Sequence, residues 1–465
     1  MTNLHTILEM KSEGLSTSEI ARRVGMPRTT VRDLLKRNKV EMVDTNAAVD
    51  YNIDGKSVAI TSWYQEHPIC DDTLEWVAKE HDLVIVIPIS QHIPSAVRLS
   101  SSESIKWPDN VVLHTSDGSI KGLNMRLDKS RVKTMYVQNP HSHSLVAHYS
   151  FQVVTGYVAV GSAPCLAITT GCINDLSFNE FLASNSKTSS HSKGALSLRH
   201  WNDKEYLMQL EAPLTKVTNY VVGDVHLPMS DLHFLEQVPE DCSVWLHDLI
   251  EFGPFSHHNL DASTNVLAKD NTESVAQFWA KMELDVATVG SSLRKRKCTP
   301  LIVQSNHDTH WITGLMNANP KQLAAEMRKI YFLVGHLMFG KKLDLATFIY
   351  NVMTLEYPDY DFTMAPVVRP TDKLRFILGN HGHRMVNGRP ADVCKLTRSG
   401  VRSIVGHFHY PSRFGPNGRA GTNSWEDLHY NTVGLTGWAK ADIIVWEDDE
   451  QEYFTHIIPA SYFKE

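Results

Sequence analysis

The sequence has little that would place it in a membrane or in an oxidising compartment. No apolar run approaches the roughly 20 residues of a membrane-spanning helix, and no secretory signal pattern begins the chain. The six cysteines form no C-x-x-C pair, so an all-thiolate metal site of that spacing is excluded. Long internal repeats and low-complexity tracts are also missing. We therefore expect a protein of a reducing, cytoplasmic interior that does not bind membranes.

The sequence does contain enough apolar material for several folded units. Its 465 residues are 42% hydrophobic, which suffices for two to three globular domains with cores. Charge is distributed unevenly, because residues 1–43 carry eight Lys or Arg against five Asp or Glu, a net +3, within a chain of net charge −7. A basic segment on an acidic chain predicts a nucleic-acid contact at the amino terminus.

Five short clusters in the second half of the chain supply Asp, His and Asn side chains. They are Gly223-Asp224-Val225-His226, His247-Asp248, Ser305-Asn306-His307-Asp308, Gly379-Asn380-His381-Gly382-His383 and Gly406-His407-Phe408-His409. Each follows a segment with a strand pattern, at 218–222, 243–246, 301–304, 374–378 and 403–405. Polar side chains at the ends of neighbouring strands are expected to converge on one edge of a sheet.

The donor types in these clusters predict a site for two metal ions. Imidazole, carboxylate and amide oxygen suit Mn²⁺ as the expected ion, with Mg²⁺, Fe and Zn²⁺ as alternatives. Two ions about 3.5–4 Å apart need a shared anionic ligand between them. Asp248 is our candidate for that bridge.

These motifs resemble those of the calcineurin-like metallophosphoesterases, whose pattern is D-x-H, G-D, G-N-H-D/E, a lone ligand His and G-H-x-H. The resemblance covers residues 216–460 and implies a β-sandwich flanked by helices. It implies one metal on Asp224, His226, Asp248 and His409, and a second on Asp248, Asn306, His381 and His407. His307 would be the acid/base that is not a ligand, and Asp308 would orient its imidazole and keep it cationic.

Three positions depart from the family pattern without removing a ligand. His247 and Ser305 stand where the family has Gly, and Glu251 stands where double-strand-break nucleases of the family tend to have His. His383 is an alternative to His381 as the lone ligand. The D-R-G sequence of the family's phosphoprotein phosphatases does not follow Asp248, which disfavours that class.

The amino-terminal residues predict a helix-turn-helix. Ser16 and Glu19 have the spacing of a capping box, Gly25 suits a left-handed turn, and Pro27 suits the start of a second helix. The segment resembles the helix-turn-helix of resolvases and bacterial regulators. Its predicted DNA contacts are Arg28, Thr29, Thr30, Arg32, Lys36 and Arg37. A role in docking or oligomerisation is the alternative, and several copies in a homo-oligomer would strengthen the weak binding of a +3 unit.

We expect an α/β chain with a helical head at 1–43, a linker at 44–56, an α/β middle domain of unknown role at 57–215 and a catalytic domain at 216–465. A helical insertion is expected at about 311–364. The predicted function is a DNA nuclease that uses metal-activated water, with His257, His258, His383 and Arg384 as possible substrate contacts. The combination resembles phage-encoded nucleases that degrade host DNA, which would place the protein in the host cytoplasm. A nucleotide or cyclic-nucleotide phosphodiesterase with a regulatory head is the alternative.

Overall fold

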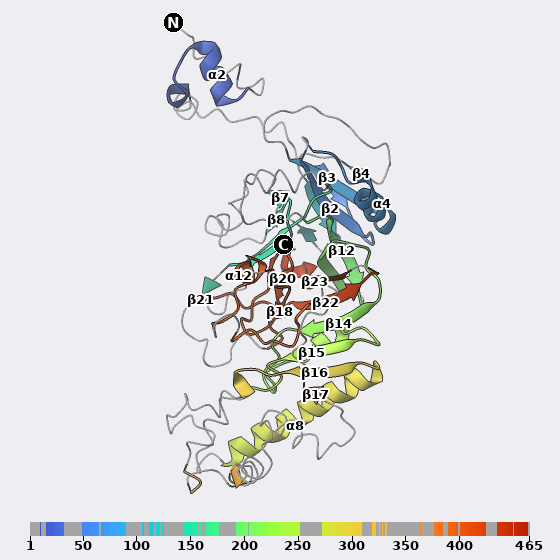
Figure 1. The fold of residues 1–465 in the computed structure, drawn as a ribbon, viewed down its shortest axis with the longest axis vertical. Helices are drawn as coiled ribbons and strands as arrows, with labels where there is room; N and C mark the ends of the chain where they lie inside the picture. The colour runs from blue at the N-terminus through green and yellow to red at the C-terminus, as the bar shows by residue number, and fades with distance from the viewer. Residues whose placement is uncertain are drawn as a thin grey trace.

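The computed structural model describes the head, most of the strands and the five clusters (Figure 1). The described residues are Met10, 15–31, 49–64, 67–89, 105–106, 111–115, 118–120, 123–124, 144–156, 158–159, 164–175, 192–202, 204–251, 272–308, 319–321, 325, 328, 331–332, 363–364, 376–384, 389–398, 400–424, 435–449 and 451–463. Helix α4 spans Asp71–Glu80. The predicted insertion at 311–364 lies largely outside the described residues.

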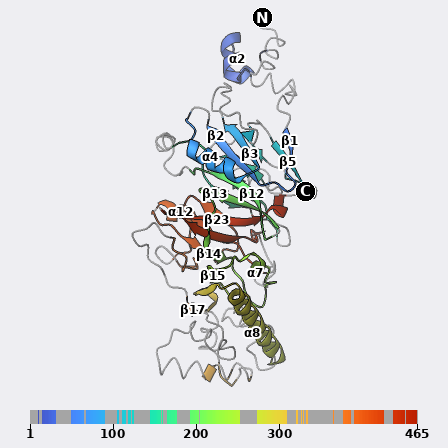
Figure 2. The same ribbon diagram turned by 90° about the vertical axis from the view of Figure 1, so that its right-hand side faces the viewer.

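A large mixed sheet runs along the molecule and contains eleven strands among the described residues (Figures 1 and 2). In spatial order these are β17 (Thr363–Met364), β16 (Thr299–Val303), β15 (Ser243–His247), β14 (Val217–Val222), β22 (Asp442–Glu447), β23 (Glu452–Pro459), β13 (Lys204–Leu210), β12 (Ala195–Trp201), β2 (Val58–Tyr64), β3 (Leu83–Ile89) and β4 (Ile105–Lys106). Strands β14, β15 and β16 are parallel neighbours, so their carboxyl ends lie at one edge.

A second sheet packs against one face of the first and has seven strands in the described part of the chain. They are β18 (Ile404–Val405), β20 (Asn417–Arg419), β19 (Ser412–Phe414), β9 (Gln152–Thr155), β11 (Leu166–Thr169), β8 (Ser144–Val146) and β7 (Leu123–Asn124). Two smaller sheets join β1 (Val49–Asn52), β5 (Val111–Thr115) and β6 (Gly118–Ile120), and β10 (Val158–Ala159) with β21 (Leu435–Thr436).

Apolar cores fill both faces of the large sheet, which makes the architecture a sandwich with helices outside it. Between the sheets, Ile60 and Ile85 pack with Val153 and Ile168. On the outer face, Met282 of α8 (Thr272–Lys295) belongs to the same core as strands β14 to β16. Further helices in the described part of this region are α7 (Phe234–Gln237), α12 (Val393–Arg398) and the short 3-10 helix η4 (Ala460–Phe463). A mixed α/β fold is thereby confirmed.

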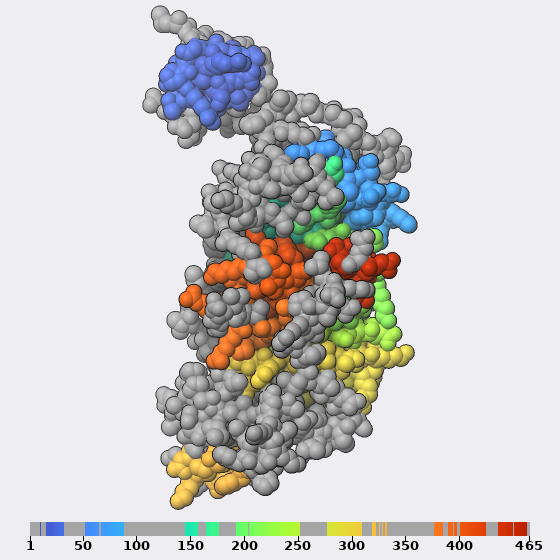
Figure 3. Space-filling view, viewed as in Figure 1, coloured from blue at the N-terminus to red at the C-terminus, as the bar shows by residue number. Residues whose placement is uncertain are grey.

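The large sheet crosses the predicted boundary between the middle and catalytic domains. Strand β13 pairs with the carboxyl-terminal β23, and β9 of the second sheet pairs with β19. In the space-filling view the red and orange segments lie directly against the green ones (Figure 3). Residues assigned to the middle domain therefore share sheets and a core with those assigned to the catalytic domain.

One predicted strand differs in the structure. The segment 374–378 is described only from Phe376, and Ile377 forms a single bridge to Ser403 instead of a strand. The main-chain N–H of Phe376 is bonded to the Glu452 carboxylate at 2.8 Å, so a side chain takes the place of a ladder partner. This arrangement still brings the following residues to the sheet edge.

The head has the predicted capping and its own small core. In α2 (Thr17–Val24), the Ser16 hydroxyl accepts from the Glu19 N–H at 3.2 Å, and Gly25 ends the helix with φ 67°. Ile20, Ala21 and Val31 are buried together. Arg28, Thr29 and Thr30 are exposed at the start of the next helical turn, as a DNA-reading surface requires.

Candidate metal centre

The clusters converge because their strands end side by side. Asp224 follows β14, Asp248 follows β15 and His307 follows β16, which are adjacent parallel strands. His407 and His409 follow β18 of the facing sheet, and a main-chain bridge between Asp224 and Thr422 links the two sheets. The ligands thus reach one point from both layers of the sandwich.

The backbone at this point is held in conformations that L-residues rarely adopt. The φ angles are 55° at His226, 40° at Asp248, 76° at His407 and 58° at His409. Each such residue costs on the order of 1–3 kcal/mol, and such strain concentrates at functional sites. The main-chain N–H of His226 donates to the carbonyl of Asp248 at 2.7 Å, which ties two of these turns together.

The described side chains form four overlapping groups with metal-ligand spacing, and two of them correspond to the ligand sets implied by the sequence. One group is Asp224, His226, Asp248 and His409, and the other is Asp248, His381 and His407; within each group the donor atoms lie within 4.8 Å of one another. Asp248 Oδ2 lies 3.0 Å from His381 Nε2 and 3.8 Å from His226 Nε2. Asp224 Oδ2 lies 3.2 Å from His409 Nε2. Asp248 is therefore shared by both groups.

The carboxylates of Asp224 and Asp248 lack hydrogen-bond donors among the described protein atoms. Both oxygens of Asp224 and both of Asp248 are buried and have no hydrogen bond of acceptable geometry to any described atom. Burying ionised carboxylates without partners costs several kcal/mol each, unless a cation is present. Oxygen and imidazole donors in this number fit divalent ions of the Mn²⁺, Fe or Zn²⁺ type. The residues therefore fit one or more metal ions.

Electrostatics divides the histidines into neutral and cationic groups. Burial, together with the charge of neighbouring imidazoles, lowers the pKa of His407 to about 4 and that of His409 well below its usual value, so both are neutral donors. Burial would also lower the pKa of His307, but Asp248 and Glu251 raise it to about 10. Burial raises the pKa of Asp224 to about 7. Asp248 stays ionised, because the charges of His381 and His307 hold its pKa well below the usual range despite its burial.

Glu251 contacts two histidines of the candidate site, and the sequence had given it no role. Its Oε2 lies 2.7 Å from His226 Nδ1 and its Oε1 lies 3.3 Å from His307 Nδ1. The resemblance implied that Asp308 orients His307; in the structure Asp308 Oδ2 accepts from the main-chain N–H of Ser305 at 2.8 Å. The available signal in the sequence was that Glu251 follows Asp248 by three residues. The main-chain bridge between Leu227 and Ile250 keeps this segment beside the site.

The remaining predicted residues lie as follows. Asn306 is partly buried beside His307, and the His383 ring lies 5.6 Å from that of His381 and 6.0 Å from that of His407. Arg384 is exposed. The other predicted contacts, His257, His258, Arg32, Lys36 and Arg37, lie outside the described residues.

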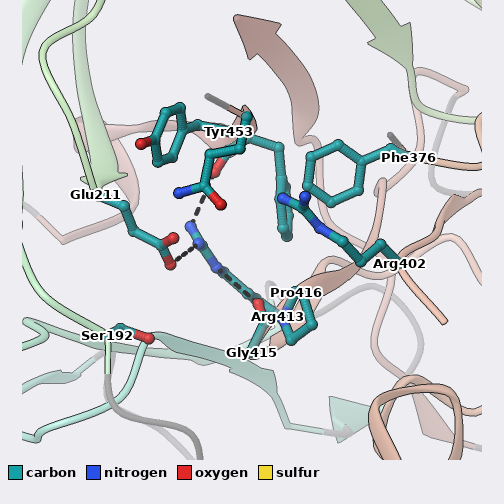
Figure 4. Close-up of a pocket in the computed structure, with 10 residues that line it drawn as sticks. Ser192, Glu211, Phe376, Arg402, Arg413, Gly415, Pro416 and Tyr453 are labelled. Carbon is teal, nitrogen blue, oxygen red and sulfur yellow. Dashed lines mark hydrogen bonds and ion pairs between the residues drawn. The ribbon is translucent and has the colours of Figure 1, made fainter. Parts of the chain in front are cut away.

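Another group of buried charges lies elsewhere in the sandwich (Figure 4). Arg413 donates from Nη2 to Glu211 at 2.7 Å, from Nη1 to the carbonyls of Gln209 and Phe454, and from Nε to that of Gly415. Arg402 lies over the Phe376 ring at 4.2 Å from its centre. Each nitrogen of Arg413 thus has a protein acceptor, so this group has the character of a structural cluster.

Comparison with known proteins identifies the head. Residues 3–41 match the sequence model of the homeodomain-like domain family. That family confirms the predicted helix-turn-helix and indicates DNA binding by the head. The chain has no match among the curated proteins or among the solved structures. None of the described helices combines the length and the apolarity needed to cross a lipid bilayer.

Proposed function

We propose that the chain is a two-metal phosphodiesterase that hydrolyses DNA, with a site of the calcineurin-like metallophosphoesterase kind and a homeodomain-like head that recruits the substrate. The observation that carries the proposal is the position of Asp248, which is buried, belongs to both ligand groups and has no hydrogen bond to a described atom. A carboxylate placed in this way fits the shared ligand of a pair of ions.

In this proposal, Asp224, His226 and His409 would hold one ion, Asn306, His381 and His407 would hold the other, and Asp248 would be shared. Such ions supply an activated water and neutralise the non-bridging oxygens of a phosphodiester. The protein's own acid is His307, whose Nε2 lies 4.0 Å from Asp248 Oδ2 and therefore faces the site. Glu251 holds Nδ1 of the same ring, so Nε2 can give its proton to the leaving oxygen.

The head favours DNA over a free nucleotide as the substrate. A small-molecule enzyme gains nothing from a DNA-reading domain, whereas a site that reads only phosphate needs another part of the chain to select duplex DNA. Mn²⁺ is the proposed ion, with Mg²⁺, Fe or Zn²⁺ as alternatives, and the proposed location is the cytoplasm, that of the host if the protein is encoded by a phage. A nucleotide or cyclic-nucleotide phosphodiesterase is the competing proposal.

The test is to incubate the full-length protein with Mn²⁺ and closed circular plasmid, with bis-p-nitrophenyl phosphate in parallel. A variant with Arg28, Arg32 and Lys36 changed to Ala should keep its activity on the small diester and lose plasmid cleavage, most clearly near physiological salt. The matched control removes three exposed lysines outside the head, Lys204, Lys216 and Lys281.

Two outcomes would contradict the proposal. Equal plasmid cleavage by the head variant and its control over a salt series would assign the head to docking or assembly. No plasmid cleavage by the parent protein, with rapid hydrolysis of nucleotides, would favour the competing small-molecule enzyme.

A further inference from the structure

His247 is a buried histidine that the two ligand groups do not use. It ends β15 directly before Asp248, pairs in register with Val303 and has no exposed surface. Its Nδ1 lies 3.3 Å from Nδ1 of His381, while its buried Nε2 has no hydrogen-bond partner among the described atoms. A buried imidazole nitrogen without a partner is unusual in a folded protein, and this one lies beside the proposed ligands Asp248 and His381.

The packing around His247 fixes its ring. A Cβ atom added at Gly406 would lie 3.0 Å from both Cβ and Cγ of His247 and would collide with Asp224 Oδ1. The absence of a side chain at Gly406 therefore provides the space in which the imidazole and the Asp224 carboxylate lie together. Because closely packed rings seldom change rotamer, His247 offers His381 a fixed partner.

The two nitrogens of His381 face different groups. Nε2 lies 3.0 Å from Asp248 Oδ2, on the side of the proposed metal pair, and Nδ1 faces His247. The 3.3 Å between the two Nδ1 atoms is a hydrogen-bond distance, and in such a pair one imidazole donates and the other accepts. A metal-ligating imidazole normally donates its other N–H to such an acceptor, which fixes the ring and its tautomer.

We propose that His247 is a positioning residue for the second metal position: its Nδ1 accepts a hydrogen bond from Nδ1–H of His381 and so keeps His381 Nε2 directed at the ion. The proposal rests on the two-metal function proposed above. The effect should fall mainly on the second ion, because His226, a proposed donor to the first ion, has Glu251 and not His247 at its Nδ1.

The experiment compares two substitutions of similar size in the full-length protein. In His247→Asn an amide oxygen can still accept from His381, whereas in His247→Leu the space is filled but no acceptor remains. Binding of Mn²⁺ is measured by calorimetry and by equilibrium dialysis with metal analysis, with thermal unfolding of the metal-free protein in parallel. The matched control is His456→Leu, since His456 is equally buried but bonds to the Arg419 carbonyl, apart from the ligand groups.

We expect His247→Leu to lower the affinity for the second ion by about 10–100-fold and to leave the affinity for the first ion unchanged. Losing other hydrogen-bond partners of metal-bound histidines has an effect of this size. His247→Asn should recover most of that loss, and His456→Leu should change stability without changing either ion. Equal affinities for the second ion in His247→Leu and the parent protein would reduce His247 to a packing residue.

Two further results have distinct meanings. Equal losses in the Asn and Leu variants would overturn the positioning role and make His247 itself a ligand, because Asp224, His247 and His381 also have metal-ligand spacing. A parent protein that binds fewer than two ions would refute the proposed function instead, before any variant is compared.

Discussion

The Asp224–Asp248 group and Arg413, which pairs with the half-buried Glu211, both place buried charges in one sandwich, yet they differ in how those charges are satisfied. Arg413 is 2% exposed, and its three nitrogens donate to a carboxylate and three carbonyls. Asp224 and Asp248 are as deeply buried, but none of their four oxygens has a hydrogen bond to a described atom.

The difference shows how a buried charge that serves the fold is distinguished from one that serves a ligand. Burial lowers the pKa of Arg413 to about 10 while Glu211 opposes the shift, so the pair stays ionised at neutral pH with its partners supplied by the protein. At the other group, the neighbouring imidazoles of His381 and His307 hold the pKa of Asp248 well below its usual range despite its burial, but its carboxylate oxygens have no hydrogen bond to a described atom. The first cluster is complete without a ligand, whereas the second has buried carboxylate oxygens that metal ions would complete.

The largest expected effect comes from removing the shared carboxylate. Asp248→Asn should eliminate hydrolysis of bis-p-nitrophenyl phosphate together with stoichiometric binding of the second ion, because the amide cannot supply the bridging negative charge. Glu211→Gln, at the satisfied cluster, is the control and should retain both ions. An active Asp248→Asn protein with two ions per chain, measured by metal analysis, would disprove the bridge.

The next largest effect tests whether His307 is a general acid or a metal ligand. His307→Ala should keep both ions and lower kcat by about 10²–10⁴-fold, since a general acid contributes that much without contacting the metal. Metal analysis and steady-state kinetics on the same preparation test this. If the variant loses an ion, His307 is a ligand and the assignment of roles is wrong.

Substitutions at the Arg413–Glu211 pair should change the stability of the protein and not its activity. Arg413→Met leaves Glu211 and three carbonyls without their donor and should lower the free energy of unfolding by about 3–5 kcal/mol. Urea denaturation measures the loss, and the double variant with Glu211→Gln should recover part of it. Activity per folded molecule should be unchanged; a loss of metal ions at Arg413→Met would mean that the two groups are coupled.

Local order along the chain made the grouping of the site side chains largely predictable. Asp224 and Asp248 each follow a recognisable strand, and these strands are parallel neighbours that end at one edge, whereas His409 arrives from the facing sheet. The capping of α2 by Ser16 and Gly25 was predictable for the same reason, because each signal acts over at most four residues.

What could not be predicted depends on contacts between distant segments. Arg413 and Glu211 are 202 residues apart in sequence, and β13 joins a strand near the end of the chain, so neither the satisfied cluster nor the shared sheet has a local signal. Glu251 was visible as a departure from the family pattern. Its contact with both His226 and His307, however, depends on the path of the chain after Asp248, which short motifs do not specify.

The smallest expected effect concerns a buried histidine whose bonds are complete. His81 is contacted at Nδ1 by the Val77 carbonyl at 2.9 Å and at Nε2 by the Ser197 hydroxyl at 2.7 Å. Burial lowers its pKa to about 4; Val77 and Asp82 oppose the shift and Arg199, which is paired with Glu80, adds to it. It therefore resembles Arg413 in having protein partners, but it is satisfied in its neutral form.

Because its folded pKa lies below the unfolded value, His81 contributes stability that is fully present above about pH 6.5 and is lost as pH falls toward 4, when the unfolded chain takes up the proton first. The full contribution is on the order of 3 kcal/mol. His81→Gln in metal-free protein should therefore flatten the decline of the urea midpoint between pH 6.5 and 4, whereas Arg413→Met should shift the curve without changing its slope there. An unchanged slope in His81→Gln would show that other groups, such as buried His456, dominate the acid sensitivity of the fold.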